Sequence, residues 1–575
     1  MVLSYYLIPT DKDKTDVLEQ TRTLFVMREN DHNRNQSKLL YRDVLDRFEA
    51  LSLGKSSVMD TAGVEEAVAV DHYANDGLAQ RHRTLVSPDI EHAPLLFLSA
   101  SQFVKRVNIS LKRTINESTD EYNPTPEKSD PIGFLQRFYR QVFMPEAELQ
   151  ITNMFYKSLS ASDSFQPLYN YGNEIERPVF RSAAALAPLI KSYESLHKNS
   201  ILGVNGDKWK VLVGIAEKYY ERSLTRFHDA VSSSEGKKKT SAEWSKNQSL
   251  INIMTEKLNQ FTEKSSNINE DGDLSELHES VKKEILVIDS LKQERSLFYN
   301  EMIFDPKKLV FLAQLRQSLN YVYNKIMDIK DLDLPGKGYK SSSSFSSKKI
   351  ISSLSYYSAL SKECLVLLRV EIIAHIIYYL DLATRESSYN SIELGINPSD
   401  NMDDIIAATM PDQYILALNS DLTLLYEKMS LYFFDYELGI LFNGISYFMA
   451  NYLVANSKHI RSFDYVGCQK MYKNIVCLQQ NLTNISLTLE NGLDIAKTYY
   501  SLFESETKSQ DSGFILKHIS ENGVIYKFNE YKQIFDFAYA AKQHGSGSGP
   551  SIVANISKSA EYKEFISKLT LLVSR

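Results

Sequence analysis

Apolar residues recur every three or four positions along most of this sequence, which constrains its fold more than any other feature. The clearest case lies between residues 467 and 492, where the apolar positions alternate steps of four and three. They are Met471, Ile475, Leu478, Leu482, Ile485 and Leu489. Steps of this size place side chains on one face of a helix, as in a heptad seam. Because alternating strand patterns are rare in the sequence, it predicts an all-α fold.

The composition favours the same fold class. The 575 residues include only 22 glycines and 15 prolines, residues that β-rich folds need at their turns. Hydrophobic residues make up 43% and charged residues 24%, which is typical of a globular protein rather than a disordered chain. At ~150 residues per domain, the length indicates several modules, which we expect to be consecutive antiparallel helical bundles.

Polar segments rich in proline, glycine, serine or charge indicate the boundaries between these bundles. The predicted linkers are residues 117–130, 232–243, 331–348 and 544–551. They separate predicted helical bundles at 1–116, 131–231, 244–330 and 349–575. The strongest boundary is DLDLPGKGYKSSSSFSSK at 331–348, which combines proline, glycine and a serine run.

Three local signals carry further expectations about helices. A proline inside a helix removes a hydrogen bond, so we expect one helix to end before Pro145 and another to begin there. Asp421 precedes the stripe of Leu422, Leu425, Met429 and Tyr432 and is expected to cap that helix. In the apolar segment 441–454, Gly444 is expected to permit close helix packing because it lacks a side chain.

No transmembrane helix is predicted. The most apolar run, Cys364–Leu380, has 17 residues and includes Arg369, Glu371 and His375. A membrane-spanning helix needs ~20 mostly apolar residues. We therefore interpret this run as a buried core helix in which His375 is a hydrogen-bonded core residue.

Charge argues against two classes of partner. The formal net charge is −7, so no basic excess is available for nucleic acid. Lys237, Lys238 and Lys239 form one basic cluster, which we interpret as a solvated loop because lipid docking usually takes more basic residues or a second anchor. We expect neither nucleic-acid binding nor strong direct membrane binding.

No cofactor, metal or catalytic site is predicted, because each partial motif lacks a required residue. Gly54-Lys55-Ser56 resembles the end of a phosphate-binding loop, but position 49 is Glu rather than the required glycine. The stretch 267–279 resembles a calcium loop, but His278 stands where a bidentate Glu belongs. We therefore expect a protein that is not an enzyme.

Potential metal ligands are also poorly spaced. His72, His82 and His92 are ten residues apart, whereas ligands on one helix need a spacing of three or four. The three cysteines are Cys364, Cys468 and Cys477. Their spacing implies neither a disulfide framework nor a zinc site, which fits a reducing cytoplasm.

The polar flank of the 467–492 helix is made of amides rather than charges. Its members are Gln479, Gln480, Asn481 and Asn484. Amides are cheaper to bury than charges, provided that they are hydrogen-bonded. We therefore hypothesise that these four side chains either cap neighbouring backbone groups or face a partner subunit. Simple exposure to solvent is the alternative.

Several blocks of the sequence resemble a known family. YVGCQKMYKNIVCLQQNLTNI at 465–485 closely resembles the C-terminal signature of exocyst subunits of the Sec-eight type. Three further blocks agree in order with that family. They are FLQRFYRQVFMPEAELQI at 134–151 with RPVFRSAAAL at 177–186, ALSKECLVLLRVEIIAHIIYYL at 359–380, and LGILFNGISYFMANYLVANSKHIRSF at 438–463. The resemblance covers about residues 90–545.

The resemblance implies an elongated rod of stacked helical bundles. It also implies a non-enzymatic subunit of an octamer that tethers secretory vesicles to the plasma membrane before fusion. The implied partners are other exocyst subunits, with Rab- or Rho-type small GTPases and SNARE machinery reached through the assembled complex. The implied location is cytoplasmic and peripheral, at plasma-membrane sites of secretion. The long N-terminal helices that join the family's subunits are expected to lie outside this sequence.

Three other functions stay open at this point. The chain could belong to another helical-rod tethering complex, which only the signature blocks oppose. A soluble all-helical enzyme with an unrecognised site would show a deep pocket with perturbed acids. A membrane-binding rod would bind liposomes in a salt-dependent way, which the net charge of −7 disfavours.

Overall fold

The computed structural model describes ten stretches of the chain, together with residues 102–103, 106–107 and 109. The stretches are 137–169, 176–198, 210–232, 239–264, 270–293, 295–329, 345–396, 406–508, 513–544 and 559–573. Residues 54–56 and His72, His82 and His92 lie outside them, as does almost all of the predicted bundle 1–116. The four predicted bundles stay predictions.

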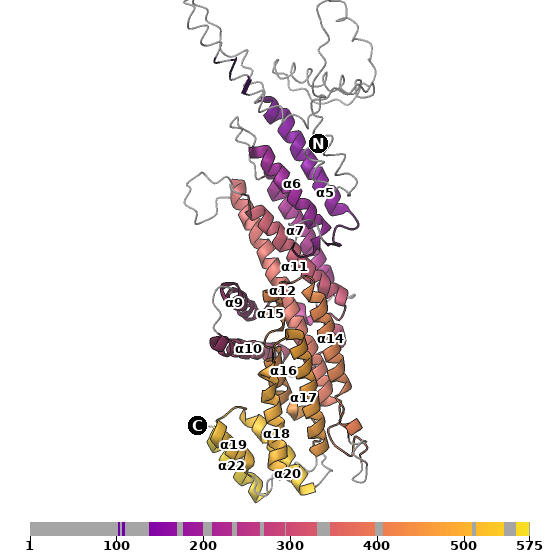
Figure 1. Ribbon diagram of the computed structural model, residues 1–575, viewed down its shortest axis with the longest axis vertical. Coiled ribbons are helices and arrows are strands. Elements are labelled where there is room, and N and C mark those ends of the chain that lie inside the picture. Colours follow the sequence, from indigo (N-terminus) through magenta and orange to yellow (C-terminus); the bar gives the residue numbers. More distant parts are fainter. Residues whose placement is uncertain are drawn as a thin grey trace, which may run out of the picture. The chain divides into compact units, whose positions relative to one another are not determined.

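The predicted all-α class is confirmed in the described residues (Figure 1). The only sheet among them pairs two strands of two residues each, β1 (Pro167–Leu168) and β2 (Val179–Phe180). The α-helices before residue 400 are α5 (Met144–Ser160), α6 (Arg181–Lys198), α7 (Lys210–Val231), α8 (Thr240–Trp244), α9 (Gln248–Lys264), α10 (Glu270–Lys292), α11 (Pro306–Met327) and α12 (Phe345–Arg385). Those after it are α14 (Gln413–Ser430), α15 (Asp435–Phe442), α16 (Ile445–Ala455), α17 (Tyr465–Ser486), α18 (Asp494–Lys508), α19 (Phe514–Asn522), α20 (Phe528–His544) and α22 (Ala560–Val573).

Short helical turns join some of these elements. They are the π-helix η4 (Tyr139–Phe143) and the 3₁₀ turns η6 (Tyr299–Glu301), η7 (Asn456–His459) and η8 (Asn491–Leu493). The chain divides into two compact units, each built from separate stretches of sequence. One comprises Met1–Gln166, Phe180–Tyr219 and Tyr321–Leu354, and the other comprises Pro167–Val179, Tyr220–Asn320 and Ser355–Arg575.

In the first unit, α5 and α6 lie side by side (Figure 1). They bury Ile151 and Phe155 from α5 and Ala183 and Leu186 from α6. The expected helix break before Pro145 is wrong, because η4 runs directly into α5 with helical backbone angles. In this wider turn the Met144 N–H donates to the Tyr139 carbonyl, five residues back, and the helix continues through the proline that follows.

In the second unit, α17 packs against α14 and α18, and α18 packs against α16 and α20. An aromatic cluster centred on the buried Phe463 joins α18 and α20. Its ring centroid lies 5.7 Å from that of Tyr500, 4.9 Å from Phe503 and 5.1 Å from Phe537. Such ring pairs add roughly 0.5–1.5 kcal/mol each beyond the area that they bury.

The predicted core helix is confirmed as part of α12. Nearly every side chain between Cys364 and Ile377 is buried, including the three polar ones, Arg369, Glu371 and His375. The stretch 267–279, in which the sequence predicts no calcium site, is helical from Glu270 onward, because those residues belong to α10.

One stretch of the described residues, Asp435–His459, is long and apolar enough to cross a membrane, with a mean hydropathy of 1.4. It is not one straight helix, because Gly444 has φ +77° and separates α15 from α16. The predicted stripe of Leu441, Ile445, Phe448 and Tyr452 is buried inside the protein. This stretch is therefore a core element, and Gly444 makes the left-handed turn between α15 and α16.

Candidate functional site

The signature helix α17 starts from a well-defined cap. The Asp464 carboxylate accepts a hydrogen bond from the Gly467 N–H (2.9 Å) and, with its other oxygen, from the N–H and Oγ of Ser391 (2.7 and 2.6 Å). One buried carboxylate thus satisfies the first turn of α17 and fixes the segment after α12 against it.

The predicted apolar stripe is confirmed from Met471 to Ile485, all of whose members are at most 5% exposed. The predicted stripe is wrong at its last member, Leu489. The helix stops at Ser486, Leu487 adopts φ +56°, and Leu489 is 74% exposed. The left-handed residue ends the helical path, so the next heptad position no longer faces the core.

The four amides of the predicted interface divide into two pairs. Gln479 donates to the Glu490 carbonyl (2.7 Å), and Asn481 donates to the Asn419 carbonyl (3.3 Å) while accepting from Thr423 Oγ1 (2.9 Å). These two amides therefore cap neighbouring backbone groups, one of the two hypothesised roles. Gln480 and Asn484 lie one turn apart and are exposed, so they are the members of the set that a partner can contact.

A shallow groove of about 450 Å³ lies between α14 and α17. Its lining residues are Asn419, Ser420, Thr423, Leu424, Glu427 and Asn481. The two helices run parallel here, since Asn419 contacts Cys477 and Thr423 contacts Asn481 at the same sequence offset. Asn419 Oδ1 is buried at the groove and has no hydrogen-bond partner among the described residues. We name this groove, with Gln480 and Asn484, the α14–α17 face.

Other polar residues of the signature helix point inward, which the sequence pattern did not predict. Lys470 pairs with Asp412 (Nζ to Oδ2, 3.1 Å) and lies 5.3 Å from the ring centroid of Tyr389. Asn474 accepts from the Asp412 N–H (2.8 Å) and donates to the Tyr389 hydroxyl (3.2 Å). The available signal was their position, one turn apart and beside the apolar stripe.

The expected cap residue Asp421 has another role. The N-cap of α14 is Asp412, whose side chain accepts from the Tyr414 N–H (3.0 Å), and Asp421 lies in mid-helix. There its carboxylate contacts His375 Nδ1 (2.6 Å), while the other ring nitrogen of His375 lies 3.2 Å from Glu371 Oε1. The expectation that His375 is a hydrogen-bonded core residue is confirmed.

This histidine is held as a cation by its surroundings. Burial alone would lower the pKa of His375, but the hydrogen bonds and negative charges of Asp421 and Glu371 outweigh burial and raise the pKa to about 9. The imidazole is 1% exposed and stacks on the Phe304 ring at 4.2 Å. A substrate cannot reach it, so we assign it a structural role.

The raised pKa of His375 predicts a dependence of stability on pH. A folded-state pKa above the ordinary 6.5 stabilises the fold fully below pH 6.5, and this contribution is lost as pH rises through about 9. The loss amounts to roughly 3 kcal/mol in the free energy of unfolding. Denaturant titrations at a series of pH values should show this decline, and the His375→Gln variant should lack it. An equal decline in both proteins would contradict the assignment.

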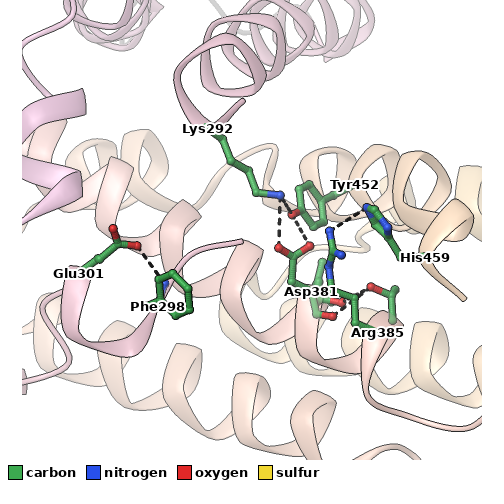
Figure 2. A network of polar contacts seen from close by, with 9 residues as sticks. Lys292, Phe298, Glu301, Asp381, Arg385, Tyr452 and His459 are labelled. Atoms are coloured by element: carbon green, nitrogen blue, oxygen red, sulfur yellow. Dashed lines mark hydrogen bonds and ion pairs between the residues drawn. The ribbon is translucent and has the colours of Figure 1, made fainter. Parts of the chain in front are cut away.

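A second buried network joins three helices (Figure 2). Lys292 of α10 donates to the Tyr452 hydroxyl of α16 and pairs with Asp381 of α12 (Nζ to Oδ2, 3.3 Å). The Tyr452 hydroxyl in turn donates to Asp381 (2.7 Å), and Arg385 contacts the imidazole of His459 (2.9 Å). These contacts link α10, α12 and α16 through buried polar groups, which indicates that they fix the packing of these helices.

Comparison with known proteins gives three informative matches. The chain is 22% identical over 441 residues to exocyst complex component 4 of Homo sapiens, which covers 73% of this chain and 43% of that protein. It is 30% identical over 184 residues to exocyst complex component 4 of Dictyostelium discoideum, covering 32% of this chain and 14% of that protein. It is 22% identical over 456 residues to a probable exocyst complex component sec8 of Neurospora crassa, covering 74% and 39%.

No family model matches the chain. The chain spans less than half the length of the curated relatives that it matches. The resemblance inferred from the signature blocks is confirmed by these matches, which come from an animal, an amoeba and a fungus.

Proposed function

We propose that this chain, a relative of the exocyst subunits of the Sec-eight type, is a non-enzymatic part of the exocyst that scaffolds other subunits through its helical surfaces. The observation that carries the proposal is the match along about three quarters of the chain to exocyst subunits of distant organisms. The buried contacts of His375 with Glu371 and Asp421 fit a rigid helical scaffold, because they join α12 to α14.

At the level of the cell, the proposal is that the complex tethers secretory vesicles to the plasma membrane before fusion. The helical bundles would serve as consecutive segments of a rod that spans distance and displays binding surfaces. The chain would be cytoplasmic and peripheral at sites of secretion. Contacts with Rab- or Rho-type GTPases and with SNARE machinery would arise through the assembled complex, in which many weak contacts add up by avidity.

The function is tested by affinity capture from a lysate of the source cells with the tagged chain. Exocyst subunits should be enriched among the captured proteins, as measured by mass spectrometry against a tag-only control. Enrichment of the subunits of a different tethering complex, without exocyst subunits, would replace this proposal by the alternative one.

We further propose that the α14–α17 face is one of the subunit contacts. Its exposed amides, Gln480 and Asn484, offer hydrogen bonds to a partner helix that lies along the two parallel helices.

The double variant Gln480→Ala/Asn484→Ala is expected to reduce subunit capture about fivefold, which is typical of losing contacts of moderate strength. Its thermal stability should stay unchanged, because both side chains are exposed. The matched control is Gln248→Ala/Asn252→Ala, which removes another pair of exposed amides one turn apart, on α9. If both double variants capture subunits equally well, the α14–α17 face is not an interface.

A further inference from the structure

An aromatic cluster lies on the second unit. Its contacting rings are Tyr299, Phe304, Tyr378 and Tyr379, and together with the adjacent exposed Phe298 we name them the aromatic ledge. Tyr299 stacks on Phe304 at 4.2 Å, and Phe304 meets Tyr378 and Tyr379 edge-on at 5.6 and 6.1 Å. Phe304 also stacks on His375, so the ledge is anchored in the core.

The outer rings of the ledge are exposed although the backbone beneath them is fixed. Phe298 is 65% and Tyr299 60% exposed. The Glu301 carboxylate accepts from the Phe298 N–H (3.0 Å, Figure 2) and pairs with Arg295 (2.6 Å). Phe298 and Tyr299 therefore place two exposed aromatic rings on a turn that Glu301 holds in position. Exposed apolar surfaces of this kind mark interaction sites more often than isolated exposed residues do.

Glu386 supplies exposed negative charge beside the ledge, while Arg295 on the turn is paired with Glu301. Glu386 is exposed and accepts from the Tyr414 hydroxyl (2.6 Å). Burial and then the charge of Glu386 raise the pKa of Tyr378, while burial and then the charge of Asp421 raise the pKa of Tyr379 to about 12. Below the rings, the His375 cation sits between two carboxylates, which leaves an excess of negative charge there.

We propose that the aromatic ledge, with Glu386, docks a basic segment of a partner protein by placing an arginine or lysine over a tyrosine ring and beside the carboxylate. Cation–π attraction to exposed rings contributes about 0.5–1 kcal/mol per contact, and a nearby carboxylate adds charge complementarity. An anionic lipid surface is disfavoured as the occupant, because the exposed carboxylate of Glu386 repels it. The inference goes beyond the proposed membership of the exocyst, because the rings and Glu386 would bind a basic segment in any assembly that contains this chain.

The experiment measures fluorescence anisotropy of a labelled helical alanine peptide that carries arginines one turn apart, titrated with the whole chain. Peptides with glutamate or glutamine in place of arginine are the ligand controls. Of the three peptides, we expect only the arginine peptide to bind. The affinity of the arginine peptide for the Phe298→Ser/Tyr299→Ser variant should be about tenfold lower than for the unaltered chain. Its affinity for the Glu386→Gln variant should depend less on salt concentration. Tyr472→Ser, which removes an exposed tyrosine of α17, should bind as the unaltered chain does.

Three outcomes would overturn the proposal. One is no binding of the arginine peptide at moderate ionic strength, and another is equal binding by every variant, which would place the peptide elsewhere on this acidic chain. The third is binding of phosphatidylserine vesicles in preference to the peptide. Circular dichroism melts establish that each variant is folded. If the double variant unfolds, Tyr299→Ser and Glu386→Gln separately provide the same comparison, because both side chains are exposed.

Discussion

Replacement of Gly467 by alanine is expected to lower the free energy of unfolding by about 3 kcal/mol or more, the upper range for overpacking a closed interface. A Cβ atom on Gly467 would overlap the backbone carbonyl of Tyr389. That carbonyl cannot move away easily, because it accepts from the Asp464 N–H (3.2 Å) at the point where the two segments pair. The first turn of α17 therefore needs a residue without a side chain.

The control for this prediction is Gly214→Ala in α7. Gly214 is exposed, and a Cβ atom there meets nothing within 4 Å. In such a place alanine should stabilise the helix by roughly 0.5–1 kcal/mol. The two substitutions are chemically identical. Denaturant titration should nevertheless give changes of opposite sign in the free energy of unfolding, because only Gly467 lies against another backbone segment. Two equal changes would show that α17 does not approach Tyr389 as closely as described.

Glu284→Gln is expected to cost about 3–5 kcal/mol, the usual penalty for leaving buried charge uncompensated. Glu284 of α10 is fully buried between Arg369 of α12 (3.0 Å for each of two contacts) and Lys257 of α9 (2.9 Å). The near-isosteric amide would leave two buried cations facing each other without a carboxylate. The control is Glu521→Gln, whose exposed pairing with Lys517 across 3.7 Å should contribute nothing measurable.

The same carboxylate predicts a loss of stability in acid. Burial alone would raise the pKa of Glu284, but the charges of Arg369 and Lys257 outweigh burial and lower the pKa to about 2. A folded-state pKa below the ordinary 4.5 gives stability that is present above pH 4.5 and is lost as pH falls toward 2. Unfolding titrations between these values should show a steeper loss for the unaltered chain than for Glu284→Gln. Parallel curves would contradict the assignment.

The sequence was sufficient to predict the fold class, because helix periodicity is a local property. The stripe of α17 follows from spacing, and the burial of the central part of α12 follows from its apolar composition and its length. The predictions of helix ends from the sequence are wrong where local signals compete. Pro145 is tolerated inside a helix because η4 changes the hydrogen-bond pattern before it. Leu489 continues the heptad in sequence, but Leu487 has already left the helical path.

The polar core was beyond prediction from one sequence. Arg369 is conspicuous within an apolar run, which signals that it has a buried partner. That partner is Glu284, 85 positions away, and nothing in the local pattern selects it among the 72 acids of the chain. Likewise, the sequence shows that the flank of α17 is made of amides, but only the packing of α14 and of the turn after α17 separates Gln479 and Asn481 from the exposed Gln480 and Asn484.

The most direct measurement is size-exclusion chromatography of the purified chain mixed with each of the other exocyst subunits in turn. A scaffolding role predicts that the chain elutes in an earlier, shared peak with at least one of them. The Gln480→Ala/Asn484→Ala variant should populate that peak less. Separate elution from every subunit, with the chain folded by circular dichroism, would contradict a role in exocyst assembly.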